Sequence, residues 1–236
     1  MKSRLSRLSI AARAQVWGLM GWVVNSFPNP LGTRLRYAYW KRRLRFLGKN
    51  VRFGVGVHIY SPEWVQIGDK CWIDDYVIIL GGPVADDGQH IYRKSNPNFS
   101  FREGEVIIGK RVHLAPFVQL QGHGGLQIGN CLTIAAGAKI YSLSHHHRDL
   151  TGQGADNVVW KFVGLVPGDE QALICAPTVI EDNAAVGLNS VVLPGSTIGR
   201  NSWLGAQSLL QGTLSPGMIA AGIPAQVLKE RSTVKD

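Results

Sequence analysis

The chain has 236 residues, of which 45% are hydrophobic, and a formal net charge of +9. Its apolar content is normal for a soluble protein with a core, and its length allows one domain or two. The charge is uneven, because no acidic residue precedes Glu63. The cations that fall before it are Lys2, Arg4, Arg7, Arg13, Arg34, Arg36, Lys41, Arg42, Arg43, Arg45, Lys49 and Arg52. No recognised nucleic-acid-binding motif accompanies them, so nucleic acid is not an expected partner.

Residues 1–48 are predicted to be a basic, Trp-rich helical segment, with one helix over 10–27 and a second over 34–47. The apolar run at 16–24 is much shorter than the roughly 20 residues that a membrane-spanning helix needs. No small-x-small cleavage site follows it, so a signal peptide is not predicted. Two roles stay open and are compatible. The helices can cover an exposed sheet edge, or they can lie on an anionic membrane face.

From Val51 onward, aliphatic residues recur every six positions. The leading positions are Val51, Val57, Ile67, Ile73, Ile79, Ile108, Leu114, Leu120, Ile128, Ile134, Ile140, Ile180, Val186, Val192, Ile198, Leu204 and Leu210. Within 180–214 the fifth position of most blocks is small, and the fourth is often Asn or Gly. This pattern predicts a triangular β-solenoid over 49–230, with a tail at 231–236. A β-sandwich is the alternative, but its strands do not keep one phase through six consecutive blocks.

The repeat is interrupted after the blocks led by Val57, Ile79, Leu120 and Ile140. If three blocks form one coil, each interruption follows the third face. All the inserted segments, including loops 81–105 and 145–178, are therefore expected at one corner of the solenoid. Loops that gather on a rigid scaffold are where functional sites are usually built.

Three consecutive histidines, at positions 145–147, lie where the longest insertion begins. One interpretation is a metal site, although no His-x4-His pair is present. Solvated loop histidines are a second. A general base is the third, and we favour it because neutral imidazole suits proton removal from a hydroxyl near pH 7. Cys71, Cys131 and Cys175 are far apart and form no CxxC motif, which indicates buried thiols of a cytosolic protein.

The chain resembles the left-handed β-helix acyltransferases, a hexapeptide-repeat family that includes galactoside, maltose and serine acetyltransferases. It is most similar to the sugar O-acetyltransferases of surface-polysaccharide biosynthesis. The resemblance covers roughly 45–230 and depends on Ser144-His145-x-His147 before an excluded loop, on the final coils, and on the closing segment Ile219–Ala225.

The resemblance implies a mostly β fold, a left-handed parallel β-helix, and a homotrimer with active sites between subunits. It also implies acetyl-CoA as the acyl donor, with no metal. His145 falls on the family's catalytic base and His147 on an acceptor-binding position, with His146 as the alternative base. Transfer would be direct, so no cysteine is involved.

The coenzyme would lie along successive coils, where small residues let it approach the backbone. The matching positions are Gly187, Leu188, Trp203, Gly205, Ala206, Ala221 and Gly222. The chain departs from its relatives in having Ala185-Val186-Gly187 where they have Trp-Ile-Gly, and in having Gly212 and Gln226 at frequently basic positions. Lys229 or Arg231 is expected to replace the missing phosphate contact.

Loop 81–105 contains aromatic and cationic side chains suited to a sugar on a phosphate carrier, although it can also simply pack on a neighbouring subunit. Its relevant residues are Tyr92, Arg93, Lys94, Phe99 and Arg102. Tyr92 and Arg93, together with His123 of the Gly-rich bulge, are expected to contact the acceptor. Asp149 or Asp156 is expected to orient the base.

These observations predict a cytoplasmic O-acetyltransferase that acts on a sugar hydroxyl of a polysaccharide or glycolipid precursor. In this prediction the N-terminus contacts the inner membrane face. The alternatives are an N-acetyltransferase acting on a nucleotide-linked amino sugar, a zinc-dependent protein of the carbonic anhydrase type, and a non-catalytic scaffold.

Overall fold

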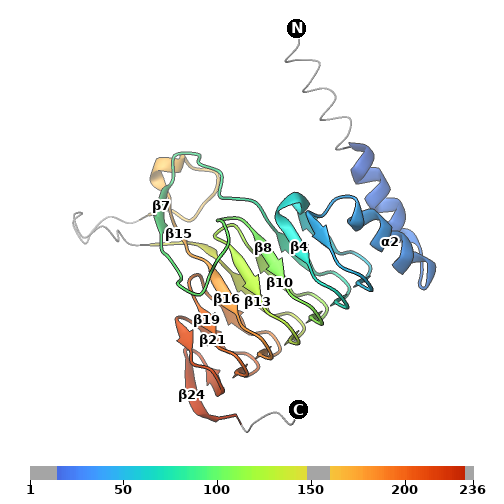
Figure 1. Ribbon diagram of the computed structural model, residues 1–236. Helices are drawn as coiled ribbons and strands as arrows, with labels where there is room; N and C mark the ends of the chain where they lie inside the picture. The colour runs from blue at the N-terminus through green and yellow to red at the C-terminus, as the bar shows by residue number, and fades with distance from the viewer. Residues whose placement is uncertain (1–14, 148–159, 232–236) are drawn as a thin grey trace.

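The computed structural model describes residues 15–147 and 160–231 and shows a three-faced parallel β-helix (Figure 1). Face A contains β1 (Phe46–Leu47), β4 (Val65–Ile67), β8 (Val106–Ile108), β11 (Leu126–Ile128), β16 (Thr178–Ile180), β19 (Thr197–Ile198) and β22 (Thr213–Leu214). Face B contains β2 (Arg52–Phe53), β5 (Trp72–Ile73), β9 (His113–Leu114), β12 (Thr133–Ile134), β17 (Ala185–Val186), β20 (Trp203–Leu204), β23 (Met218–Gly222) and β24 (Ala225–Glu230). Face C contains β3 (His58–Tyr60), β6 (Ile78–Leu80), β10 (Gln119–Gln121), β13 (Lys139–Tyr141), β18 (Val191–Val192) and β21 (Leu209–Leu210).

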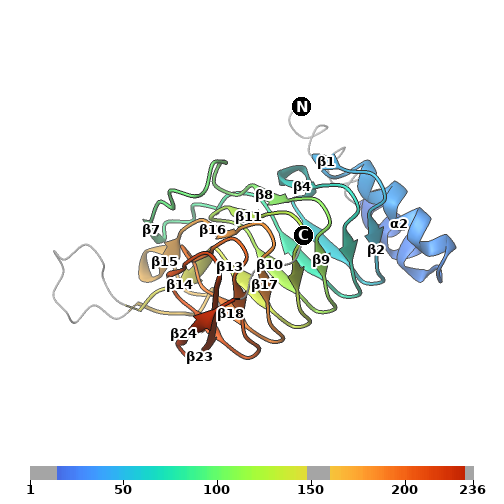
Figure 2. The same cartoon turned by 60° about the horizontal axis from the view of Figure 1, so that its bottom comes forward.

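The chain passes from face A to B to C and then begins the next coil. Neighbouring coils pair in parallel throughout, apart from the antiparallel closing pair β23–β24. The leading aliphatic residues fill the interior, and Ile67, Ile73 and Ile79 are essentially inaccessible to solvent. The predicted left-handed β-helix is therefore confirmed, and its coils are visible end to end in Figure 2.

The predicted phase of the first coil was wrong by two residues. Phe53 pairs with Ile73 and Ile59 with Ile79, so Phe53 and Ile59 are leading positions in place of Val51 and Val57. The error has a physical cause, because the fifth position of each block also points inward. In this coil the fifth position is valine, which is buried like the leading residue and cannot be distinguished from it by sequence.

Two corners of each coil require a residue with positive φ at the fourth position of the block. The row at the corner between faces B and C, here called the B–C corner, consists of Gly56, Tyr76, Phe117, Gly137, Asn189 and Gln207, with φ between 53° and 70°. Gly and Asn adopt this conformation at low cost, whereas a bulky residue does not.

The insertions leave from the corner between faces C and A, as predicted. A short one contains η1 (Pro62–Trp64), and the longer ones occupy 81–105 and 142–177, the latter with η2 (Gly168–Glu170). They contribute β7 (His90–Arg93), β14 (Leu143–His145) and β15 (Ala172–Cys175) to a small separate sheet, here called sheet D. β15 pairs antiparallel with β14 and parallel with β7. Sheet D projects from the solenoid wall (Figure 1).

The N-terminal helices cover the first coil (Figure 1). Residues 15–26 are helical, and the rest of the helix predicted over 10–27 lies outside the described residues. α2 (Leu31–Lys41) replaces the helix predicted over 34–47. It ends earlier because Phe46–Leu47 pairs with β4 as the first strand of face A. Tyr39 and Trp40 of α2 are buried against this coil.

Arg36 of α2 is wholly buried, and no carboxylate among the described residues lies within bonding distance of it. Its guanidinium donates to the carbonyls of Val24 and Phe27, which are at the C-terminal end of the first helix, at 3.4 and 3.1 Å. It also donates to the carbonyl of Phe53 at 2.9 Å. Burial lowers the pKa of Arg36, while Asp75 partly opposes that change. Arg36 thus joins both helices to β2 through the free carbonyls that helix ends present.

We predict that Arg36→Met lowers the free energy of unfolding by about 3 kcal/mol, because buried carbonyls lose their donors. Arg34→Met is the matched control, since Arg34 is on the same helix and exposed. It should change stability by less than about 0.5 kcal/mol. Urea denaturation followed by circular dichroism measures both. Equal stability of the two variants would contradict the joining role.

Candidate functional site

His145 is the last residue of β14 and lies opposite Leu173 of β15 in sheet D. Its side chain is exposed, and its ring lies edge-on to Phe162 with centroids 6.1 Å apart. The start of β14 is fixed to the solenoid, because Gln121 Oε1 accepts a hydrogen bond from the Leu143 N–H at 2.9 Å. His145 is therefore held by strands and not by an isolated loop. Asp149 and Asp156, proposed to orient it, lie outside the described residues.

Tyr92 and Arg93 of β7 lie in the same sheet as His145, since β15 is between the two strands. The Tyr92 ring is edge-on to His146, with centroids 6.2 Å apart, and the His146 and His147 rings are 5.0 Å apart. Arg93 Nε donates to Glu103 at 3.0 Å, and this bond raises the pKa of Arg93. Side chains alternate along a strand, so Tyr92 lies on the same face of sheet D as His146, whereas His145 lies on the other face with Arg93.

His123 lies in the bulge one coil before the histidine run. Its Nδ1 is 2.8 Å from the carbonyl oxygen of Gly82. A carbonyl only accepts, so Nδ1 holds the proton, and Nε2 of the neutral ring keeps its lone pair. The following residue, Gly124, donates to Ser142 Oγ at 2.9 Å, which places His123 beside the start of the second long insertion.

Loop 81–105 packs on its own chain. Asn96 is buried and donates to the carbonyl of Pro177 at 3.1 Å and to Thr197 Oγ1 at 3.0 Å. At the base of the loop Glu105 pairs with Arg45 and Arg102. Burial alone would raise the pKa of Glu105, but hydrogen bonds from both arginines bring it below its ordinary value. The loop is therefore anchored at both its middle and its end.

The predicted coenzyme positions lie elsewhere, on or beside the B–C corner. Gly187 and Leu188 follow β17, and Gly205 and Ala206 follow β20. A Cβ on Gly205 would come within 2.9 Å of the Ala221 Cβ, and one on Gly187 would strike the Ala206 backbone. Close packing of the next coil by itself requires glycine at these two positions.

The remaining predicted donor-site residues are not all at that corner. Trp203 projects from face B and is 46% exposed. Ala221 and Gly222 end β23 at the B–C corner, whereas Lys229 pairs with Ile219 near the opposite end of the same strand. Arg231 donates to the Asn183 and Asn201 carbonyls at 3.0 and 3.2 Å, at the corner between faces A and B. The described chain therefore does not bring Lys229 or Arg231 next to Gly205.

The two predicted halves of the site are separated by face C. The histidine run follows β13 and leaves at one edge of that face, while Gly187 and Gly205 precede β18 and β21 at its other edge. A single copy of the chain thus presents them on different corners of the triangle.

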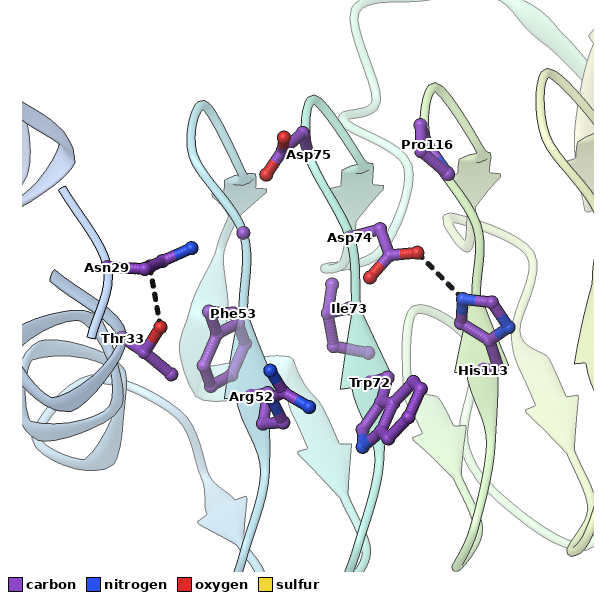
Figure 3. A pocket seen from close by; sticks show the side chains of 11 residues that line it. Asn29, Thr33, Arg52, Phe53, Trp72, Ile73, Asp74, Asp75, His113 and Pro116 are labelled. Atoms are coloured by element: carbon purple, nitrogen blue, oxygen red, sulfur yellow. Dashed lines mark hydrogen bonds and ion pairs between the residues drawn. The ribbon is translucent and has the colours of Figure 1, made fainter.

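Face B has a hollow of about 430 Å³ that sequence reasoning missed (Figure 3). Within it His113 Nε2 is 2.7 Å from Asp74 Oδ2, and the Arg52 guanidinium lies 5.0 Å from the Trp72 ring centre. These residues occupy positions of the repeat that point outward. The sequence did contain a sign of this hollow. Arg52, Trp72, Asp74 and His113 are cationic, aromatic, acidic and titratable side chains at outward positions of a wall that has no insertion.

Comparison with known proteins supports the fold and the chemistry. A family profile described as "Hexapeptide repeat of succinyl-transferase" matches residues 177–208. Galactoside O-acetyltransferase of Escherichia coli K12 is 41% identical over 174 residues, which are 73% of this chain and 66% of that protein. The chain belongs to the hexapeptide-repeat acyltransferase family.

Two further proteins that are similar to this acyltransferase are described with a nucleotide-linked sugar. The dTDP-4-amino-4,6-dideoxy-D-glucose acyltransferase of Escherichia coli is 24% identical over 79% of this chain and 82% of its own length. A structure of AntD, an N-acyltransferase from Bacillus cereus in complex with dTDP-4-amino-4,6-dideoxyglucose and coenzyme A, has a TM-score of 0.64. It is 21% identical and covers 84% of this chain and 89% of its own, which shows a shared fold.

The cysteines of this hexapeptide-repeat acyltransferase differ in exposure. Cys71 and Cys175 are buried as predicted, but Cys131 is exposed, so the prediction of a buried thiol was wrong at that position. Burial, followed by the nearby Glu103, raises the pKa of Cys175 to about 11. Cys175 is close to the histidine run, since it pairs with Leu143. Within residues 15–147 and 160–231, no three His, Cys, Asp or Glu side chains converge to hold a metal ion.

We predict that iodoacetamide at pH 7.5 labels Cys131 and leaves Cys175 unmodified. With a pKa near 11, only about one Cys175 in 3,000 is the reactive thiolate at that pH. Labelling of Cys175 should accelerate about tenfold per pH unit until the pH approaches that pKa. Peptide mass spectrometry measures both sites. Rapid labelling of Cys175 at neutral pH would show an activated thiol and would argue against a reaction that uses no cysteine.

Proposed function

We propose that this protein is an acetyl-CoA-dependent acyltransferase that transfers an acetyl group to a sugar hydroxyl of a polysaccharide or glycolipid precursor. The observation that supports this most is sheet D, a small sheet on an otherwise regular scaffold that joins the strand of His145 to the strand of Tyr92 and Arg93 through β15. A solenoid that served only as a spacer would not need two long insertions that pair with each other.

In the proposed reaction, neutral His145 accepts the proton of the acceptor hydroxyl while the oxygen attacks the thioester carbonyl carbon. The tetrahedral intermediate then collapses, its C–S bond breaks, and the coenzyme A sulfur receives the proton from His145. Backbone N–H groups of an adjoining coil would stabilise the oxyanion, at roughly 3 kcal/mol for one such donor. His147, His123, Tyr92 and Arg93 would bind the acceptor.

The donor site would use the small residues of the B–C corner, with Leu188 and Trp203 beside them. Coenzyme A is named in the AntD complex, and acetyl transfer is named in the galactoside relative. Because face C separates Gly205 from His145, the proposal requires a second copy of the chain to supply one half of each site. A homotrimer satisfies this requirement.

Transfer to an amine is the second candidate, because the AntD complex contains an amino sugar and that protein is an N-acyltransferase. The two reactions differ in what the base must do. A free amine near neutral pH attacks without prior proton removal, whereas a hydroxyl needs a base in the transition state. The dependence of the rate on His145 therefore separates the candidates as well as testing the first.

We predict that His145→Gln lowers kcat for an O-acetyl acceptor by about 10²- to 10⁴-fold. His58→Gln is the matched control, since His58 is exposed on β3 in the first coil. Acetyl-CoA should raise the melting temperature of both variants, because a ligand at 100 times its Kd stabilises by about 2.7 kcal/mol. If kcat is unchanged in His145→Gln but falls strongly in His123→Gln or His146→Gln, the general base is that other histidine and not His145. Absence of any shift with acetyl-CoA would contradict the donor.

The first helix suggests that the protein works at the inner face of a membrane. Leu19 and Trp22 are 64% and 70% exposed, and Val16, Met20 and Val23 extend the same apolar stripe. The spacing places these residues on one side of the helix. No helix in the described part of the chain is long and apolar enough to cross a bilayer. We therefore propose peripheral contact with anionic lipid by a cytoplasmic protein.

We predict that the full chain co-sediments with vesicles containing phosphatidylserine and that Leu19→Glu weakens this binding about tenfold, because burial of one leucine is lost. Leu165→Glu is the matched control, since Leu165 is 95% exposed in a different segment. Equal binding by both variants, or none by the unmodified protein, would contradict a membrane role for the helix.

A further inference from the structure

Two aromatic residues occupy corner positions that require positive φ, as Gln207 in the same row and Lys70 and Arg111 at the other corner also do. Tyr76 and Phe117 belong to the B–C corner row and have φ of 59° and 63°. A bulky side chain in this left-handed conformation is an outlier that costs free energy. The coils on either side of them use Gly56 and Gly137, which have no such cost.

Burial does not explain these residues, because Tyr76 and Phe117 are 52% and 62% exposed. Their rings are stacked, with centroids 5.4 Å apart and planes 5° from parallel. A Cβ on Gly56 would lie 2.5 Å from the Tyr76 ring, so that ring covers the preceding coil. Phe117 continues the stack by one layer. Together the two rings form a surface that we call the aromatic platform.

The outer side of the platform is not covered by its own row. The next member, Gly137, has no side chain to place over Phe117, and the one after it, Asn189, extends its amide only over Gly137. A cation is close by, because Lys139 Nζ donates to the Gly137 carbonyl at 3.1 Å. The platform therefore combines a free aromatic face with a positive charge one coil away.

We propose that the aromatic platform binds the base of a nucleoside diphosphate that carries the acceptor sugar, with Lys139 next to the phosphates. Every nucleobase has a π face that can stack on an aromatic side chain. A cation beside the stack would attract the negative charge of a diphosphate. This inference rests on the proposed function and narrows its acceptor to a nucleotide-linked sugar. Strained residues that persist on a surface are typical of binding sites.

Position along the solenoid supports the acceptor over other occupants. Gly187 and Gly205 lie on the same corner toward the C-terminal end, so a donor bound along them and a base stacked on Phe117 would be in line. The proposed homotrimer brings a second protein copy near this corner, but that copy is not the expected occupant of the aromatic platform itself. The rest of the row offers glycine, Asn189 and Gln207, not an apolar surface.

The test uses isothermal titration of the full chain with dTDP, UDP, thymidine and acetyl-CoA. The diphosphates dTDP and UDP should bind. Phe117→Asn should weaken their binding by about tenfold or more and leave the binding of acetyl-CoA unchanged. Lys139→Gln should weaken the binding of dTDP severalfold and leave the binding of thymidine, which has no phosphate, unchanged. The melting temperature of Phe117→Asn should stay the same or rise, because Asn adopts positive φ readily. Phe46→Asn, at an exposed phenylalanine on β1, is the control and should not alter nucleotide binding.

Each other result overturns the inference in a recognisable way. A lower melting temperature with unchanged dTDP binding would make the platform a packing feature. Weaker acetyl-CoA binding in Phe117→Asn would assign the stacked ring to the donor's adenine. A changed oligomeric mass would assign it to a second copy. If acetyl-CoA binds and no nucleotide does, the acceptor is not nucleotide-linked and the proposed acyl transfer stands. If neither binds, the proposed function itself fails.

Discussion

The stacking of each coil on the next is the constraint from which the other features follow. Parallel ladders on all three faces fix equivalent side chains in rows, one coil apart. The rows that point inward must be aliphatic, and the corner rows must tolerate positive φ or a close neighbour. Gly187 and Gly205 are required by this packing before any ligand is considered. A residue that violates its row, as Phe117 does, therefore carries more information about function than one that obeys it.

The same regularity explains why the insertions leave from a corner and not from within a face. A segment inserted within a face would break the ladders on both sides of it, whereas one inserted between faces C and A leaves every strand paired. Once the long segments leave together they can pair with each other, and sheet D is the result. Histidines at the end of β14 thus gain the positional precision of a strand although they belong to an insertion.

Sequence periodicity predicted the coils and the shared corner because both depend on local repeats. It could not predict sheet D, since the pairing of Leu173 with His145 and Ile91 joins segments that are far apart and have no repeat. It extended the second helix to residue 47 because the composition of Phe46–Leu47 suits a helix and a strand equally. It placed the aliphatic phase of the first coil two residues early, because valine filled the fifth position there. It also missed the pairing of Asp74 with His113, which depends on register between coils.

The separation of the two half-sites has a consequence for assembly. The histidine run and the row containing Gly205 lie at opposite edges of face C, so a complete site needs one corner of one copy against a different corner of the next. Such a contact is heterologous, and repeated heterologous contacts give either a closed ring or an open filament. A closed ring, such as the proposed homotrimer, completes every site, whereas an open filament leaves an incomplete site at each end. On the proposed function, the separation of the half-sites by face C therefore makes assembly a condition of activity.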